Sequence, residues 1–388
     1  MYIYSMNYSS EISLSRSAAE NNISVIRDLV GRNVRISSVV KANAYGHGII
    51  SFVPLVLNMG IDHFSVFNYN EAIEVYKLVK KKADIMIMGW IDPVFIPDTI
   101  KKGIEFFVFD LNRLKTALEA SKELKKAARI HLEIETGMNR TGFNKRDFNK
   151  ALKIIAENKK YLKVKGLCSH LAGAESIANH VRVKNQIKTF NTFRKEIEKQ
   201  KIFPEYYHLA CSAAAVCYPS SRFNLVRTGI IQYGFWPSKE VFLRYASKKT
   251  DFSNPLERVI TWTSEVMSVK SVKTGKFVGY GTTYLAQNDI KIAVIPVGYS
   301  VGYSRSLSNR GRILINGTRC SVIGLVNMNM IIVDVTSAGE VKPGDSATLI
   351  GTQNDLSISV DSFGEISQQI NYEILSRLPR DIPRIVAD

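Results

Sequence analysis

The stretch DHFSVFNYNEAIEVYKLVKKKADIMIMGW, residues 62–90, predicts a strand, a helix and a second strand in succession. Short apolar runs at 62–67 and 84–90 flank residues 70–82, where apolar side chains recur at intervals of three and four. The same alternation runs from about residue 11 to 240 and yields eight candidate strands, the other six being 35–43, 105–110, 129–135, 164–170, 206–211 and 226–230. Eight such units predict an α/β fold with an N-terminal (β/α)8 barrel, and an open doubly wound sheet is the structural alternative.

The pattern changes after about residue 245. Apolar or alternating runs follow one another there without long helices between them, at 259–272, 290–299, 311–326, 328–336 and 346–352. Turn signals such as Asn316-Gly317 separate several of these runs. We therefore expect a barrel domain over residues 11–245 and a C-terminal all-β domain that consists of residues 246–388 together with about residues 1–10.

The bulk properties predict a folded, soluble protein. Hydrophobic residues make up 45% of the 388 positions and charged residues 22%, as in an average globular chain. The formal net charge of +17 raises the question of nucleic-acid binding, but the lysines lie mainly in amphipathic helical patterns, which favours solvated helix faces. Neither a basic leader with an apolar run nor a stretch of about 20 apolar residues is visible, so we expect a cytoplasmic protein that binds neither membrane nor nucleic acid.

Lys41 is the first candidate for chemistry. It ends an apolar run in SSVVKANAYGHG, residues 37–48. Burial of an ammonium group is unfavourable unless the group is paired or neutral, and a desolvated lysine has the lowered pKa that Schiff-base chemistry needs. The alternative is a lysine just past the strand end that reaches water.

Three more polar residues lie at ends of predicted strands. Arg140 lies in the loop ETGMNRTGF (135–143), and His170 and Arg227 follow the same placement. The carboxyl ends of barrel strands carry the active site, and a fixed arginine suits a carboxylate. Taken singly, the loop is also compatible with an ordinary surface loop and the histidine with a structural role. Tyr280, in FVGYGTTYLAQ (277–287), fits a tight turn, and that segment alone indicates no chemistry.

Together these segments resemble one known family. VVKANAYGHG, TGMNRTGF, SHLAGAE, VRTGI, VGYGTTY, IPVGY and NYEILSRLPRDIPRI occur in the order seen in alanine racemases, from about residue 11 to the end. The resemblance implies a barrel that binds pyridoxal 5′-phosphate (PLP), a C-terminal β domain, and a head-to-tail homodimer with shared active sites. It also implies interconversion of L- and D-alanine, with supply of D-alanine for peptidoglycan as the role, and no metal site.

The resemblance assigns roles position by position. Lys41 corresponds to the lysine that binds PLP and acts as base for the D-substrate, and Tyr280 of the partner subunit to the base for the L-substrate. Arg227 corresponds to the partner of the pyridine nitrogen, where a guanidinium that keeps its proton weakens the electron sink. The remaining correspondences are His170 beside the cofactor ring, Tyr45, Ser212, Gly229 and Ile230 at the phosphate, Arg140 and Met328 at the substrate carboxylate, and Tyr299 and Arg305 at the entrance.

Four positions depart from the family pattern. Glu133 stands where many members have a lysine, often carbamylated, and we expect its carboxylate to hold Arg140 by direct charge pairing. Asn327 and Asn329 replace the usual Cys and Asp around Met328, and Arg380 stands at the position of a phosphate-binding tyrosine. A racemase of serine or of broad specificity, and a non-catalytic PLP-binding protein, are therefore the alternatives. The β domain and Tyr280 argue against the second.

Overall fold

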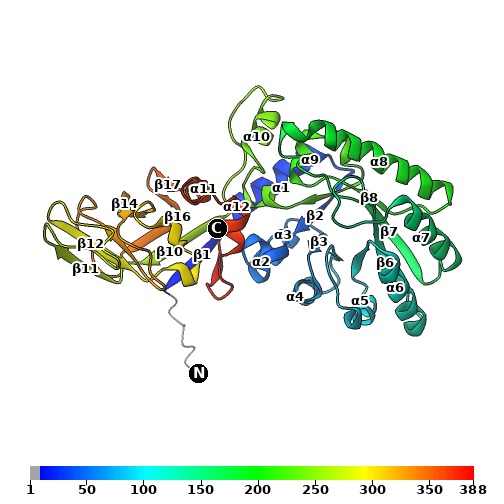
Figure 1. Ribbon diagram of the computed structural model, residues 1–388, viewed down its shortest axis with the longest axis horizontal. Coiled ribbons are helices and arrows are strands. Elements are labelled where there is room, and N and C mark those ends of the chain that lie inside the picture. The colour runs from blue at the N-terminus through cyan, green and yellow to red at the C-terminus, as the bar shows by residue number, and fades with distance from the viewer. Residues whose placement is uncertain (1–8) are drawn as a thin grey trace. The chain divides into compact units, whose positions relative to one another are not determined.

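The computed structural model describes residues 9–388, which divide into two compact units. The barrel unit comprises Ser17–Lys41 and Val53–Glu257. The β unit comprises residues 9–16 together with Ala42–Phe52 and Arg258–Asp388. Figure 1 shows these residues coloured along the sequence.

Eight parallel strands form the barrel unit in the order β8-β7-β6-β5-β4-β3-β2-β9 (Figure 1). Their bounds are β2 Arg35–Val39, β3 His63–Val66, β4 Asp84–Ile87, β5 Glu105–Val108, β6 Ala128–Glu133, β7 Leu162–Cys168, β8 Tyr206–His208 and β9 Leu225–Thr228. The two edge strands are linked just beyond β8 by a parallel bridge between Cys211 and Arg227, so the sheet is nearly closed. All eight predicted strands are present, and the predicted barrel is confirmed over the doubly wound alternative.

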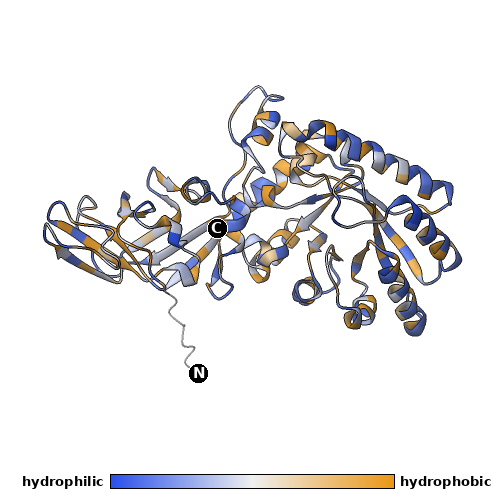
Figure 2. Ribbon diagram, in the orientation of Figure 1, coloured by the Kyte–Doolittle hydropathy of each residue, from blue (hydrophilic) through white to orange (hydrophobic). Residues whose placement is uncertain are grey.

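Helices connect the barrel strands, because their apolar residues recur on one face. In α7 (Lys145–Glu157) the buried residues are Phe148, Ala151, Leu152 and Ile155, and Figure 2 shows hydrophobic and hydrophilic residues alternating around this helix. Asn144 caps its first turn by accepting a hydrogen bond from the Asp147 N–H at 2.9 Å. The other helices are α1 Arg16–Val30, α3 Ile49–Asn58, α4 Tyr69–Val79, α5 Ile96–Lys102, α6 Leu111–Leu124, α8 His180–Lys199, α9 Ser212–Cys217 and α10 Lys239–Ala246.

The β unit is built on a sheet with the order β11-β12-β15-β14-β13-β16-β10-β1-β18, to which β17 adds by pairing with β16. The strands are β1 Ser10–Ser15, β10 Ile260–Glu265, β11 Ser268–Val272, β12 Ile290–Ile295, β13 Arg312–Ile315, β14 Thr318–Val322, β15 Ile331–Asp334, β16 Ser346–Gln353, β17 Leu356–Ile358 and β18 Arg384–Ala387. The predicted C-terminal β sheet is confirmed. Two short helices, α11 (Val360–Ser367) and α12 (Asn371–Ser376), add to it.

Within residues 9–388, no helix has both the length and the apolar composition needed to cross a bilayer.

Candidate active site

Lys41 lies two residues beyond β2 and begins a strained turn. In α2 (Lys41–Tyr45) the residues from Ala42 to Tyr45 all have positive φ, between 51° and 54°. Each non-glycine residue in this left-handed conformation costs about 1–2 kcal/mol. The side-chain oxygen of Asn43 accepts a hydrogen bond from the Ile49 N–H at 3.0 Å, and the Asn43 carbonyl accepts from the Gly48 N–H at 2.8 Å, which fixes the turn. Such strain is typical of functional positions.

The surroundings of Lys41 favour its neutral amine. Burial lowers the pKa of Lys41, and the positive charges of Arg140 and Arg227 lower it further, against the opposing charge of Glu71. A neutral amine is the form that acts as nucleophile or as base. Lys41 lies just past the end of β2 and is half-buried.

Arg227 is a buried cation in β9, with 5% of its surface exposed. Its Nη2 donates to the Ser169 carbonyl oxygen at 2.7 Å, and its Nη1 donates to the His208 carbonyl oxygen at 3.0 Å. Nη1 also donates to Nδ1 of His208. These acceptors fix the guanidinium plane at the end of three neighbouring barrel strands.

His170 follows β7 and is neutral at physiological pH. Burial lowers the pKa of His170 to about 3, and the charges of Arg227, Arg140 and Lys41 act in the same direction. Since all three side chains act on the His170 ring, the residues predicted at separate strand ends lie within electrostatic range of one another.

The loop that carries Arg140 is organised by Glu135. Its carboxylate accepts hydrogen bonds from the N–H groups of Met138 at 2.7 Å and Asn139 at 2.9 Å, and also from that of Gly137. Burial raises the pKa of the Glu135 carboxyl, but these backbone donors outweigh it and leave the pKa below its usual value. The Arg140 side chain is exposed at the tip of this ordered loop.

Glu133 is a buried carboxyl with an unused acceptor. Its exposed fraction is 4%, and its Oε2 has no hydrogen-bond partner. Burial raises its pKa, while a hydrogen bond with Thr141 and the charge of Arg140 oppose the rise. In the part of the chain that the structure describes, Glu133 forms no ion pair with Arg140, so the direct pairing expected from the sequence is not formed in this structure.

A hydrogen bond between Ser212 and Gly229 joins the start of α9 to the start of the 3₁₀ helix Ile230–Tyr233. Ser212 begins α9, and its hydroxyl oxygen accepts a hydrogen bond from the Gly229 N–H at 2.9 Å. Ile230 begins the 3₁₀ helix Ile230–Tyr233. Beside them, Oγ1 of Thr228 is buried without a partner. Backbone N–H groups at helix starts, with spare hydroxyl groups, suit an anion such as phosphate.

Several predicted residues belong to the β unit, among them Tyr299 and Arg305 of the predicted entrance. Tyr45 packs its ring against that of Tyr372, with centroids 5.8 Å apart. Tyr280 is 72% exposed in a tight loop, where the Val278 N–H donates to the Tyr284 carbonyl at 2.9 Å. Met328 is 56% exposed, and its carbonyl accepts from Ser300 Oγ at 2.7 Å. The barrel unit thus holds Lys41, Arg140, His170, Ser212, Arg227, Gly229 and Ile230, and the β unit holds Tyr45, Tyr280 and Met328.

Comparison with known proteins places this geometry in a family. Residues 14–237 match the alanine racemase N-terminal domain, and residues 259–386 match the alanine racemase C-terminal domain. The chain belongs to the alanine racemase family. It is 33% identical over 370 residues to alanine racemase 1 of Caldanaerobacter subterraneus subsp. tengcongensis, covering 95% of this chain and 92% of the relative. It is 36% identical over 367 residues to alanine racemase of Clostridium perfringens, covering 94% and 92%.

A solved alanine racemase shares the fold. The structure of the Bacillus anthracis protein with bound L-Ala-P superposes with a TM-score of 0.89 at 27% identity, covering 99% of this chain and 96% of that one. The resemblance seen in the sequence motifs therefore extends over both units.

Two residues of this alanine racemase family member escaped the sequence interpretation. Gln186 on α8 is 1% exposed and donates through Nε2 to the His170 carbonyl at 3.0 Å. It occupies a position on the buried stripe of α8, beside Val183 and Phe190, so a polar residue among apolar ones was the available signal. His208 was also missed, because nothing in its short strand indicates a contact with Arg227.

Proposed function

We propose that this chain interconverts L-alanine and D-alanine, using PLP bound through Lys41. The observation that carries the proposal is the environment of Lys41: a buried amine on a strained turn at a barrel strand end, with its pKa lowered by burial and by Arg140 and Arg227. The relatives reported above carry the name alanine racemase, and the B. anthracis structure contains L-Ala-P. The same chemistry fits this chain.

The residues present fit PLP. The cations Arg140 and Arg227 both act on Lys41 and on His170, and the orphaned Oγ1 of Thr228 belongs to the residue before Gly229. An anionic cofactor and an anionic substrate complement that surplus of positive charge. Lys41 would hold PLP covalently, Arg227 would face the ring nitrogen, His170 the ring, and Tyr45, Ser212, Gly229 and Ile230 the phosphate.

The protein residues divide the work of proton transfer. Bound PLP supplies an electron sink that stabilises negative charge at the substrate Cα. The Lys41 amine takes or returns the Cα proton on one face, and the Tyr280 hydroxyl acts on the other, because racemisation requires a base on each face. Arg140 and the backbone of Met328 hold the substrate carboxylate, which limits rotation about Cα.

A homodimer completes the site in this proposal. The exposure of Tyr280 and of Met328 supports a role at a neighbouring subunit, because a buried catalytic contact within the same β unit would cover them. We expect each subunit to supply Tyr280 to its partner's Lys41. The proposal includes a cytoplasmic location and supply of D-alanine for peptidoglycan, without a membrane or nucleic-acid partner.

Serine is the second candidate substrate. Asn329, in place of the usual Asp, removes the charge that the family places beside the carboxylate site, and Asn327 replaces the usual Cys. A substrate pocket separates a methyl from a hydroxymethyl group only modestly unless the extra hydroxyl clashes. Alanine and serine must therefore be compared directly.

The test combines spectroscopy with chiral analysis. We expect purified protein to show a Schiff-base absorbance band that borohydride removes by fixing the cofactor on Lys41, and to racemise L-alanine faster than L-serine or L-lysine. Lys41→Ala should lose both properties, and the exposed Lys153→Ala should keep both. PLP binding without racemisation of any of these amino acids would overturn the proposed function. Faster turnover of serine would replace the substrate.

A further inference from the structure

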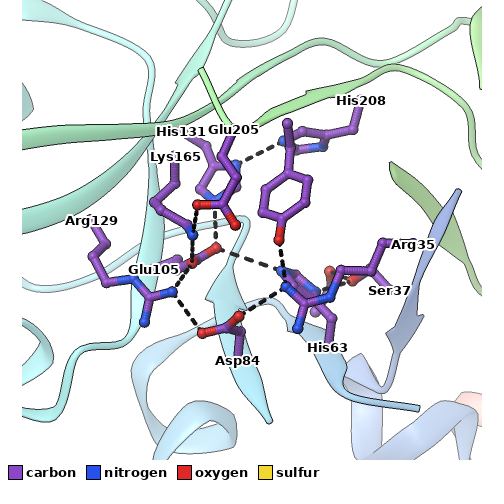
Figure 3. A network of polar contacts seen from close by, with 12 residues as sticks. Arg35, Ser37, His63, Asp84, Glu105, Arg129, His131, Lys165, Glu205 and His208 are labelled. Carbon is purple, nitrogen blue, oxygen red and sulfur yellow. Dashed lines mark hydrogen bonds and ion pairs between the residues drawn. The ribbon is translucent and has the colours of Figure 1, made fainter. Parts of the chain in front are cut away.

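A buried polar network lies in the barrel unit (Figure 3). Its centre is Glu105, the fully buried first residue of β5. Glu105 Oε1 accepts a hydrogen bond from Arg129 Nη2 at 2.5 Å and lies 3.6 Å from Lys165 Nζ. Glu105 Oε2 lies 2.7 Å from His131 Nε2. Both carboxylate oxygens therefore face donors.

Two histidines connect Glu105 to Arg227. His131 Nδ1 lies 2.8 Å from His208 Nε2, and His208 Nδ1 accepts from Arg227 Nη1 (Figure 3 shows the two histidines). Both imidazoles are completely buried. The result is an unbroken chain of four side chains from Glu105 to the guanidinium.

The two ends of this chain fix the protons between them. A guanidinium only donates and a carboxylate only accepts, so His208 Nδ1 must accept and His131 Nε2 must donate. Each imidazole is then neutral, with its proton on Nε2. Burial lowers the pKa of His131, and burial together with the charge of Arg227 lowers the pKa of His208 well below its usual value, which agrees with neutral rings.

Gly166 makes room for the contact between the histidines. A Cβ atom at this position would lie 2.1 Å from His131 Nδ1 and 2.8 Å from His208 Nε2. The β6–β7 pairing shifts register between Ile130 and His131, and Lys165, next to Gly166, is 3% exposed beside Glu105. The local backbone is thus shaped around the histidine pair.

The hydrogen-bond acceptors of Arg227 are neutral groups. Among residues 9–388, Arg227 forms no ion pair, and its acceptors are carbonyl oxygens and His208.

We propose that Glu105 is a positioning residue for Arg227, acting through His131 and His208. Because Glu105 accepts on both oxygens, each hydrogen bond between Arg227 and Glu105 has its donor on the Arg227 side. His208 Nδ1 is thereby held as an acceptor for the guanidinium. The Arg227 guanidinium thereby stays protonated, and its remaining N–H groups point in one fixed direction. This inference rests on the proposed role of Arg227 at the cofactor ring nitrogen.

The first test needs neither cofactor nor substrate. The chain has six histidines, and ¹⁵N labelling of histidine in the cofactor-free protein reports the tautomer of each by NMR. We expect His131 and His208 both neutral, with the proton on Nε2, at pH 7. An Nδ1 proton or an imidazolium on either ring would overturn the proposal. This outcome is independent of whether the protein racemises alanine.

The second test changes Glu105, the carboxylate at which the series of hydrogen bonds ends. In Glu105→Gln the side-chain NH₂ has two possible orientations. If it faces Arg129 and Lys165, it is a donor that meets other donors. If it faces His131, His131 Nε2 must accept, and the direction of the hydrogen bonds from Glu105 to His208 is reversed. We expect altered tautomers of His131 and His208, and a fall in kcat of roughly 10- to 100-fold with KM for alanine changed by less than about threefold. Gly166→Ala, which adds no charge, should lower kcat in the same way by separating the histidines.

Glu205→Gln is the matched control. It removes the same charge from the network, at the half-exposed partner of Lys165, without touching either histidine. We expect wild-type tautomers and kcat within about threefold of wild type. Wild-type tautomers and kcat in Glu105→Gln, or equal losses in Glu105→Gln and Glu205→Gln, would overturn the proposal. If Glu105→Gln fails to fold, the wild-type tautomers and Gly166→Ala decide.

Discussion

Gln186 Nε2 donates a hydrogen bond to the carbonyl oxygen of His170 at 3.0 Å. Oε1 of the same amide accepts from the Ala172 N–H at 2.9 Å, and Nε2 lies 3.3 Å from Thr136 Oγ1. One buried side chain on α8 therefore ties the segment after β7 to the loop after β6. These two segments carry His170 and Arg140, so their spacing depends on Gln186.

We predict that Gln186→Leu destabilises the barrel unit. The variant leaves the Ala172 N–H and the His170 carbonyl buried without partners, and a loss of about 2–4 kcal/mol in the free energy of unfolding is expected. Urea unfolding of the cofactor-free protein measures it. Gln200→Leu, exposed at the end of the same helix, should change the value by less than about 0.5 kcal/mol. Equal effects of the two substitutions would contradict the assigned role.

Glu135→Gln is predicted to weaken substrate binding. The amide places an NH₂ donor among backbone N–H donors from Gly137, Met138 and Asn139, so the loop that presents Arg140 loses its organising acceptor. We expect KM for alanine to rise about tenfold while kcat changes by less than about threefold. Steady-state kinetics in both directions measure this. Glu157→Gln, on the exposed face of α7, serves as the control, and an unchanged KM in Glu135→Gln would refute the prediction.

Local sequence patterns were sufficient for most of the fold. Short apolar runs located all eight barrel strands, because strands buried on both faces leave continuous Val, Ile and Phe runs. The end of β2 was harder to predict. Four successive residues from Ala42 to Tyr45 adopt a left-handed backbone that L-residues disfavour, and only tertiary contacts such as Asn43 to Ile49 select it.

Local sequence patterns could not predict pairings between residues that are distant in the sequence. Strand β1 pairs in parallel with β18, Ile12 opposite Arg384, although these strands lie at opposite ends of the chain. The site shows the same limit. Motifs indicated Arg227 and His170, whereas the chain from Arg227 through His208 to Glu105 depends on which inward-facing residues meet across the barrel. Hydrophobic periodicity carries no information on which inward-facing side chains contact one another across the barrel.

We predict that acid destabilises the protein through His170. The pKa of His170 is lowered to about 3 by burial and nearby cations, whereas an unfolded chain titrates near pH 6.5. The unfolded state thus binds an extra proton between these values, so stability falls as the pH is lowered from about 6.5 toward 3 and is unaffected by this group above pH 7. The contribution is about 1.4 kcal/mol per pH unit.

Urea unfolding of the cofactor-free protein at pH 7, 6 and 5 measures the slope. Other buried histidines contribute too, so the comparison with His170→Asn isolates this one. On acidification, the free energy of unfolding of the variant should fall less steeply than that of the wild type. The difference should correspond to one proton, about 1.4 kcal/mol per pH unit. Parallel pH dependences of the two proteins would show that His170 is not held neutral by the fold.

Hybrid dimers provide the sharpest test of a shared active site. Lys41→Ala and Tyr280→Phe should each abolish racemisation, since each removes one of two required bases. If Tyr280 acts on the partner's Lys41, a dimer of one Lys41→Ala subunit and one Tyr280→Phe subunit has one site with both wild-type residues and one with neither. Co-expressed in equal amounts, half of the dimers are hybrid, and about a quarter of wild-type activity is expected. Co-expression of two differently tagged Lys41→Ala chains, the control, should give none. If Tyr280 serves the Lys41 of its own chain, every site in a hybrid lacks one base, and the mixture stays inactive.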